Sequence, residues 1–131
     1  MRYLLDTNAV ISMLNQADRK VVLSVEKHRR QDVVTSSIVV HELYFGAYKS
    51  ASPQKNVAAI ELLNIAVLDF DSADAREAGR VRAHLAGKGR PIGPYDLLIA
   101  GQALRHDLVL ITANTREFRQ VPGLICEDWS R

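Results

Sequence analysis

Short apolar runs alternate with segments of helical periodicity along the whole chain. The runs that are typical of buried strands lie at 3–5, 33–35, 66–70 and 108–111, and an edge strand is expected at 124–126. Between the runs, apolar residues recur at spacings of three and four, which is typical of amphipathic helices. Because parallel strands need a long crossover that is usually a helix, this alternation predicts an α/β protein with a parallel sheet and right-handed connections.

Candidate capping residues indicate where the helices begin. The expected helices cover about 7–14, 18–28, 37–47, 53–65, 72–87, 96–104 and 116–120. The helix at 53–65 is apolar on more than one face, from Val57 to Ile65. We therefore expect this helix either to be deeply buried or to pair with a partner.

The chain is long enough for one domain, which we place at residues 1–131, and too short for a second core. Its 47% apolar and 24% charged residues match ordinary globular proteins. The single cysteine, Cys126, allows no internal disulfide and favours a reducing, cytoplasmic compartment. No apolar run approaches the roughly 18 residues of a membrane span. An acid at position 6 comes too early for a signal peptide. We therefore expect neither a secreted mini-protein nor a membrane protein.

Basic residues gather in two stretches, at 27–30 and at 76–90, although the net charge is only +2. Five cations stand between positions 76 and 90 against one acid, Glu77; they are Arg76, Arg80, Arg82, Lys88 and Arg90. Such a stretch can serve as a footprint for phosphates. It can equally be a solvated helix end, because cations favour helix C-termini.

Acidic and amide side chains stand near the ends of the predicted strands. Asp6 ends the first strand, and Glu42 lies one turn into the helix after the second. Asp96 opens the helix before the fourth strand, and Asn114 and Glu117 follow that strand. Because ligands of open α/β sheets bind at the carboxyl ends of the strands, we expect these side chains to converge. Each also has a structural alternative as a helix cap, a turn residue or a solvated side chain.

Clustered carboxylates need a counter-charge. Two unit charges about 4 Å apart repel by about 4 kcal/mol at an effective dielectric near 20. A divalent cation reverses the sign of this energy, and oxygen ligands without paired Cys or His favour Mg²⁺ or Mn²⁺ over zinc. Such a site supports metal-assisted hydrolysis of a phosphodiester.

Four segments resemble the sequence motifs of PIN-domain nucleases. They are YLLDTN at 3–8, SSIVVHELYFGA at 36–47, PIGPYDLLIA at 91–100 and LITANTREF at 110–118. The resemblance runs in order over essentially the whole chain and is closest to VapC-type toxins of bacterial toxin–antitoxin pairs. It implies a three-layer α/β/α PIN-like fold, with a mostly parallel central sheet flanked by helices. It also implies cleavage of structured RNA that depends on Mg²⁺ or Mn²⁺.

The resemblance further implies roles for individual residues. Three residues match the acidic metal-site positions of the family: Asp6, Glu42 and Asp96. Asn114 stands where many relatives have Asp, and Glu117 is acidic in many relatives, so either could complete the catalytic metal site. Three others match polar positions that support the acids by hydrogen bonding: Thr7, Asn8 and Thr112.

Contacts with RNA and with other proteins are expected as well. Arg90, just before Asp96, could place a phosphate near the metal, with Arg82 in the same basic stretch. Tyr95 could stack on a base or fill the groove wall. The resemblance implies a tRNA substrate, with the initiator tRNA anticodon stem-loop for the subgroup that carries a loop like 89–94. It also implies a homodimer and a VapB-type antitoxin that alone contacts operator DNA.

Two alternatives stay open. Phosphatases of the haloacid dehalogenase type also begin with an aspartate after an apolar strand, here Asp6, but they need a second Asp where this chain has Asn8. A non-catalytic RNA- or protein-binding module of the same fold is the other alternative. Against that module stands the complete set of Asp6, Glu42 and Asp96, because uncompensated carboxylates in a cluster cost stability.

Overall fold

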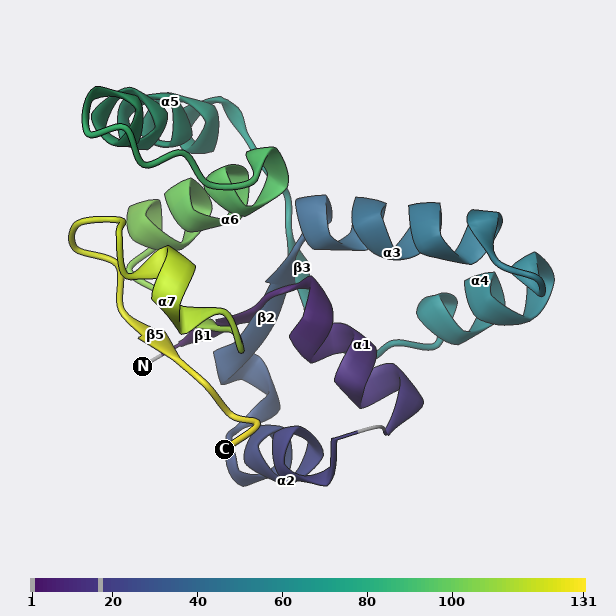
Figure 1. The fold of residues 1–131 in the computed structure, drawn as a ribbon. Helices are drawn as coiled ribbons and strands as arrows, with labels where there is room; N and C mark the ends of the chain where they lie inside the picture. Colours follow the sequence, from purple (N-terminus) through teal and green to yellow (C-terminus); the bar gives the residue numbers. More distant parts are fainter. Residues whose placement is uncertain (1, 17) are drawn as a thin grey trace.

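A parallel sheet forms the centre of the molecule (Figure 1). The computed structural model describes residues 2–16 and 18–131, and within them the sheet has five strands in the order β3-β2-β1-β4-β5. The strands are β1 (Tyr3–Leu5), β2 (Val33–Ser36), β3 (Ala66–Leu68), β4 (Val109–Ile111) and β5 (Cys126–Glu127). Every neighbouring pair runs parallel, so the predicted α/β class is confirmed.

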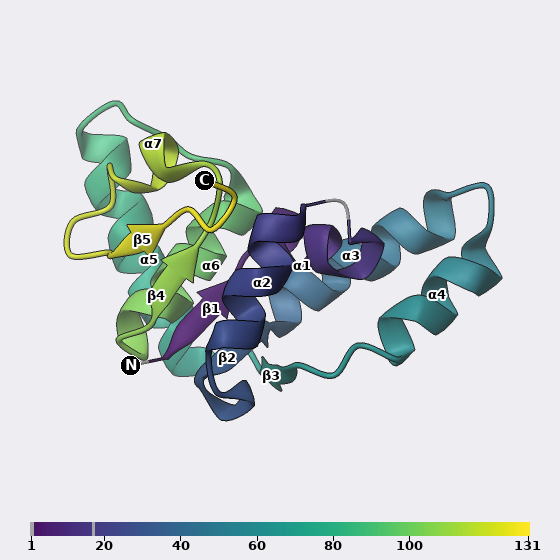
Figure 2. The same cartoon turned by 90° about the horizontal axis from the view of Figure 1, so that it is seen from below.

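Helices connect the strands and cover both faces of the sheet. They are α1 (Thr7–Asn15), α2 (Arg19–Lys27), α3 (Ser37–Lys49), α4 (Pro53–Glu61), α5 (Ser72–Gly87), α6 (Pro94–Arg105) and α7 (Thr115–Phe118), with a 3₁₀ turn at Arg30–Asp32. Helices α1 and α2 lie on one side of the sheet, and α5 and α6 lie on the other (Figures 1 and 2). The expected three-layer α/β/α arrangement is therefore confirmed.

The core lies between the central strands and α6. Leu4, Leu5 and Leu110 of the strands are fully buried, and so is Ile99 of α6. Helices α5 and α6 approach closely at Gly101, where an added Cβ would stand 2.6 Å from the Cα of Ala78. A side chain at position 101 would therefore push these helices apart, which makes glycine a packing requirement there.

Helix α4 differs from its prediction. The apolar pattern predicts a helix to residue 65, but α4 ends at Glu61 and only Ile60 of it is buried. Leu62, which follows, is 83% exposed. With α3, α4 forms an arm that extends away from the sheet (Figure 2), so Ile60 alone among its residues joins the core and Val57 packs at the margin of the core, partly buried. Deep burial within this chain was the wrong alternative for this segment.

The strand ends also differ by a few residues. Strand β3 stops at Leu68 rather than at residue 70, and β5 covers Cys126–Glu127 rather than 124–126. Both strands lie at the edges of the sheet, where only one neighbour determines the pairing. No helix in 2–16 or 18–131 combines the length and the apolar character needed to cross a bilayer.

Candidate active site

The pairing of the strands brings three residues together at the carboxyl edge of the sheet. Leu5 pairs with Thr35 on one side and with Ile111 on the other. The next residues along these strands, Asp6, Ser36 and Thr112, therefore emerge side by side. All three are buried, and the backbone N–H of Asp6 donates to the carbonyl of Ile111 at 3.0 Å. This edge is where the sequence predicts a ligand site.

Asp6 is at once a helix cap and a member of the acidic cluster. Its Oδ1 accepts a hydrogen bond from the backbone N–H of Ala9 at 2.9 Å, which caps α1. Burial raises the pKa of this carboxyl, against the lowering effect of hydrogen bonds from Thr112 and Ala9. The charges of Glu42 and Asp128 raise the pKa further. Asp6 therefore fits both interpretations of its place in the sequence, because it caps α1 and is also one of the clustered acids.

Glu42 is held by the beginning of α1. It lies on α3, and its Oε1 accepts a hydrogen bond from the hydroxyl of Thr7 at 2.8 Å. Thr7 is the first residue of α1, directly after Asp6. The contact therefore orients Glu42 at the carboxyl edge of the sheet.

Asp96 lies in the first turn of α6 and is partly buried. Burial raises the pKa of its carboxyl to about 6, and the charges of Glu117, Asp6 and Glu42 add to this rise in that order. Acids from four separate segments of the chain therefore repel one another at one place. The predicted convergence of Asp6, Glu42, Asp96 and Glu117 is present in the structure.

Asn114 and Glu117 contact each other beside the cluster. The side-chain amide of Asn114 donates to Oε2 of Glu117, and the backbone N–H of Gly93 donates to Oε1 at 3.1 Å. The backbone N–H of Asn114 donates to the Thr112 hydroxyl at 3.0 Å. Thr112 thus links the turn after β4 to Asp6.

Asn8 and Asp128 lie on the other side of Asp6. Asn8 is exposed on α1 and, with Thr112 and Asp128, lines a small pocket. Sequence reasoning missed Asp128, whose charge reaches Asp6. The signal was available, because Asp128 directly follows the last strand at this same edge.

The donor chemistry fits a hard divalent cation, since every acid in the cluster offers carboxylate oxygens. The side chains do not form a ready chelate, because no group of three or more His, Cys, Asp or Glu within 2–16 and 18–131 is arranged to hold a metal ion. Glu42 and Glu117 are instead held by donors from the protein. These hydrogen bonds orient the two carboxylates, and a cation would relieve the repulsion that adds to the effect of burial on the pKa of Asp96.

Comparison with known proteins identifies the family. A model of the PIN domain matches residues 3–124. The chain belongs to the PIN domain family. It is 42% identical to a tRNA(fMet)-specific endonuclease VapC of Shigella flexneri, over 99% of each chain. The predicted resemblance to VapC proteins is therefore confirmed.

Solved structures agree with this assignment. DNA-bound VapBC from Salmonella typhimurium has a chain that is 39% identical, with a TM-score of 0.92 over 98% of both chains. A chain of VapBC-1 from Haemophilus influenzae is 34% identical, with a TM-score of 0.89 over 100% of both chains. This PIN domain therefore shares its fold with chains of solved toxin–antitoxin complexes over almost its full length.

The residues expected to bind RNA are all exposed in this PIN domain. Arg90 is exposed in the loop between α5 and α6. Tyr95 is 46% exposed, and the centre of its ring lies 5.3 Å from that of His41. Arg82 is exposed on α5. None of the three is buried, so each can reach a ligand.

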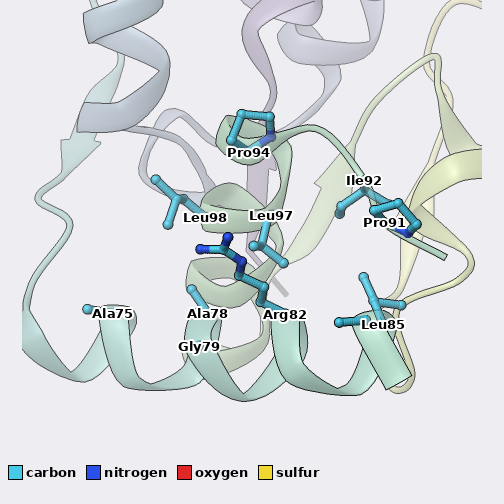
Figure 3. A pocket seen from close by; sticks show the side chains of 11 residues that line it. Ala75, Ala78, Gly79, Arg82, Leu85, Pro91, Ile92, Pro94, Leu97 and Leu98 are labelled. Carbon is cyan, nitrogen blue, oxygen red and sulfur yellow. The ribbon is translucent and has the colours of Figure 1, made fainter. Parts of the chain in front are cut away.

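A cavity of about 690 Å³ lies between α5 and α6. Leu85, Leu97, Pro91 and Ile92 line it, and Figure 3 shows the guanidinium of Arg82 leaning across it. Its lining contains none of the clustered acids. The candidate chemistry is therefore in the polar edge of the sheet and not in this apolar cavity.

Proposed function

We propose that this PIN domain is a metal-dependent endoribonuclease that acts as the toxin of a toxin–antitoxin pair. The observation that carries the proposal is the convergence of Asp6, Glu42 and Asp96 at the carboxyl edge of the sheet, where burial raises the pKa of Asp6 and of Asp96 and the charge of Glu42 adds to both rises. The family match and relatives that are named endonucleases and ribonucleases support it. A structured RNA, with initiator tRNA first, is the proposed substrate because the Shigella flexneri relative is named for that specificity.

Asp6, Glu42 and Asp96 would hold Mg²⁺ or Mn²⁺. When bound, the cation supplies activation of water and charge neutralisation at the scissile phosphate. Hydrogen bonds within the chain hold two of these carboxylates in position. The cap on α1 fixes Asp6, and Thr7 orients Glu42. Arg90 and Arg82 neutralise phosphates of the RNA, and exposed Tyr95 offers a stacking surface for a base.

A VapB-type antitoxin is the proposed inhibitor. Support comes from the solved complexes of similar chains, which are VapBC assemblies, one of them bound to DNA. A flexible cationic segment of the antitoxin would be attracted by the clustered carboxylates and would block the RNA. In this proposal the antitoxin contacts operator DNA, and the PIN domain forms a homodimer.

A cleavage assay tests the proposal. Purified protein is incubated with initiator tRNA in Mg²⁺, in Mn²⁺ and in EDTA, with Asp96→Asn as the matched variant. We expect cleavage only with metal, and loss of cleavage in Asp96→Asn while its circular dichroism spectrum is unchanged. Cleavage that persists in EDTA would overturn metal dependence, and an active Asp96→Asn would remove Asp96 from the site.

A further inference from the structure

Glu117 uses both of its carboxylate oxygens to join two segments of the chain. Oε1 accepts the backbone N–H of Gly93 at 3.1 Å, 24 positions earlier in the sequence. Oε2 accepts the side-chain amide of Asn114, the residue that precedes α7. We call this pair of hydrogen bonds the Glu117 clasp. It connects the turn after β4 to the residue that begins α6.

Gly93 contacts both Glu117 and Asp96, and so connects the clasp to Asp96. Gly93 is the N-cap of α6, and its carbonyl accepts the N–H of Leu97 at 2.9 Å. A Cβ on Gly93 would stand 3.4 Å from Oδ2 of Asp96, so the Asp96 carboxylate lies against this glycine. No side chain caps the first turn of α6 from position 93, and the N–H of Gly93 itself has Glu117 as its acceptor.

The other end of the same loop is tied to α5. The N–H of Arg90 donates to the carbonyl of Leu85 at 2.9 Å, and the N–H of Gly89 donates to Ala86 at 3.1 Å. Gly89 has a φ of +63°, which glycine adopts without strain. The loop between Lys88 and Gly93 is thus fixed at both ends, with Arg90 inside it.

We propose that Glu117 is a positioning residue that, through Gly93, sets the place of Asp96 and of the loop that carries Arg90. The inference rests on the proposed nuclease function and assigns Glu117 a role other than the metal ligand that its sequence pattern predicts. The two hydrogen bonds hold the beginning of α6. Each Glu117 oxygen keeps a second lone pair, so the variants below, and not the hydrogen bonds alone, separate positioning from ligation.

Variants of the clasp separate positioning from ligation. Glu117→Ala removes both acceptors, and we expect kcat to fall at least about tenfold, as misplaced reacting groups do. Glu117→Gln keeps an acceptor for the N–H of Gly93. The side-chain amide of Asn114 can rotate so that its oxygen accepts from the new glutamine, and we therefore expect this variant to keep most of the native kcat. Asn114→Asp places a second carboxylate against Glu117, which breaks the clasp by repulsion and lowers kcat. All three keep the affinity for Mn²⁺ measured by electron paramagnetic resonance, and Asp96→Asn serves as the variant that loses it.

The double variant Asn114→Asp with Glu117→Gln tests whether the clasp can be rebuilt after Asn114→Asp alone has broken it. The glutamine introduced at position 117 then donates to the aspartate introduced at position 114 and still accepts from Gly93. The clasp forms again with its donor and acceptor exchanged, and we expect kcat to return to within about threefold of the native protein.

A ligand role predicts the opposite pattern for the single variants. Glu117→Gln would then lose Mn²⁺ affinity and kcat together, and Asn114→Asp would be as active as the native protein or more so. Either result would overturn the positioning role. Failure of the proposed function is distinct, because the native protein itself would then not cleave RNA in Mg²⁺.

Discussion

The hydroxyl of Thr7 donates a 2.8 Å hydrogen bond to Oε1 of Glu42 across 35 positions of sequence. The two residues lie on helices that leave adjacent strands, β1 and β2. The bond therefore connects two of the predicted motifs at the carboxyl edge. It gives Glu42 a defined direction before any ligand arrives.

Removing this hydroxyl should reduce activity more than stability. For Thr7→Val we expect kcat to fall several-fold because Glu42 loses its orientation, and the free energy of unfolding to fall by about 1 kcal/mol. Thr7→Ser keeps the hydroxyl and is the matched control. RNA cleavage rates and chemical denaturation measure the two effects. A Thr7→Val protein with native kcat would show that the bond does not matter for Glu42.

At position 6, activity and stability should change in opposite directions. Asp6→Asn keeps an acceptor for the N–H of Ala9, while it removes a buried charge that Glu42 and Asp128 repel. We expect cleavage to be lost and the melting temperature of the metal-free protein to rise. Asp6→Ala, which also loses the cap, should be less stable than Asp6→Asn by about 1 kcal/mol. A lower melting temperature for Asp6→Asn would mean that the carboxylate acts mainly as a cap.

Asp96 should make the metal-free protein less stable as pH rises. Its pKa is about 6 in the folded chain, above the ordinary value of 3.8. Below both values the carboxyl is protonated in both states and contributes nothing. As pH rises from 3.8 to about 6, the folded state binds more protons than the unfolded state, so the free energy of unfolding falls. Comparing native protein with Asp96→Asn in EDTA should reveal a loss of about 1–3 kcal/mol between about pH 4 and pH 7. A difference independent of pH would contradict this.

Two glycines on facing helices should respond oppositely to alanine. At Gly101, the new Cβ would stand 2.6 Å from Ala78, so we expect Gly101→Ala to lower the free energy of unfolding by about 1–3 kcal/mol. At Gly79 on α5, a Cβ meets nothing within 4 Å. Gly79→Ala should therefore stabilise the protein by about 0.5–1 kcal/mol. Thermal melts of both variants test the close packing of α5 and α6, and equal shifts would argue against it.

RNA affinity should depend on Arg90 and not on cations at the opposite edge of the sheet. Arg90→Ala should weaken binding of RNA and reduce the salt dependence of the binding constant, while Mn²⁺ affinity stays native. Arg29→Ala is the control, because Arg29 is also exposed but stands before β2, at the opposite edge of the sheet. Fluorescence anisotropy at several salt concentrations measures both. Equal losses for the two variants would dismiss a specific contact by Arg90.

Local sequence signals were sufficient for the central elements. The runs at 3–5, 33–35 and 108–111 form the three central strands of the sheet, where most of their residues are buried. Their apolar sequence therefore indicates their central position directly. The segment at 53–65 is different, because only Ile60 of it is fully in the core, while Leu62 is 83% exposed and its other large apolar residues are partly buried. Composition records that a side chain is apolar, but not whether its contact lies within the same chain.

Site residues that stand near the end of a strand or the start of a helix could be predicted from the sequence. Contacts between residues far apart in the sequence could not. Asp6, Glu42 and Asp96 could be found because acids at strand and helix ends share one edge. The support of Gly93 by Glu117 could not, since the bond joins segments 24 residues apart through a backbone N–H. Nothing in either residue type marks such a partner.

Because Asp6 caps α1 and also belongs to the acidic cluster, selection for folding and selection for RNA cleavage should accept different residues at position 6. Asn, Ser and Thr are good helix caps, so each would preserve the first turn of α1 at position 6. A library screened only for folding would accept them all, and a library screened for RNA cleavage should return Asp alone. Variation at this one position would then distinguish populations that must keep an enzyme from populations that need only keep a scaffold.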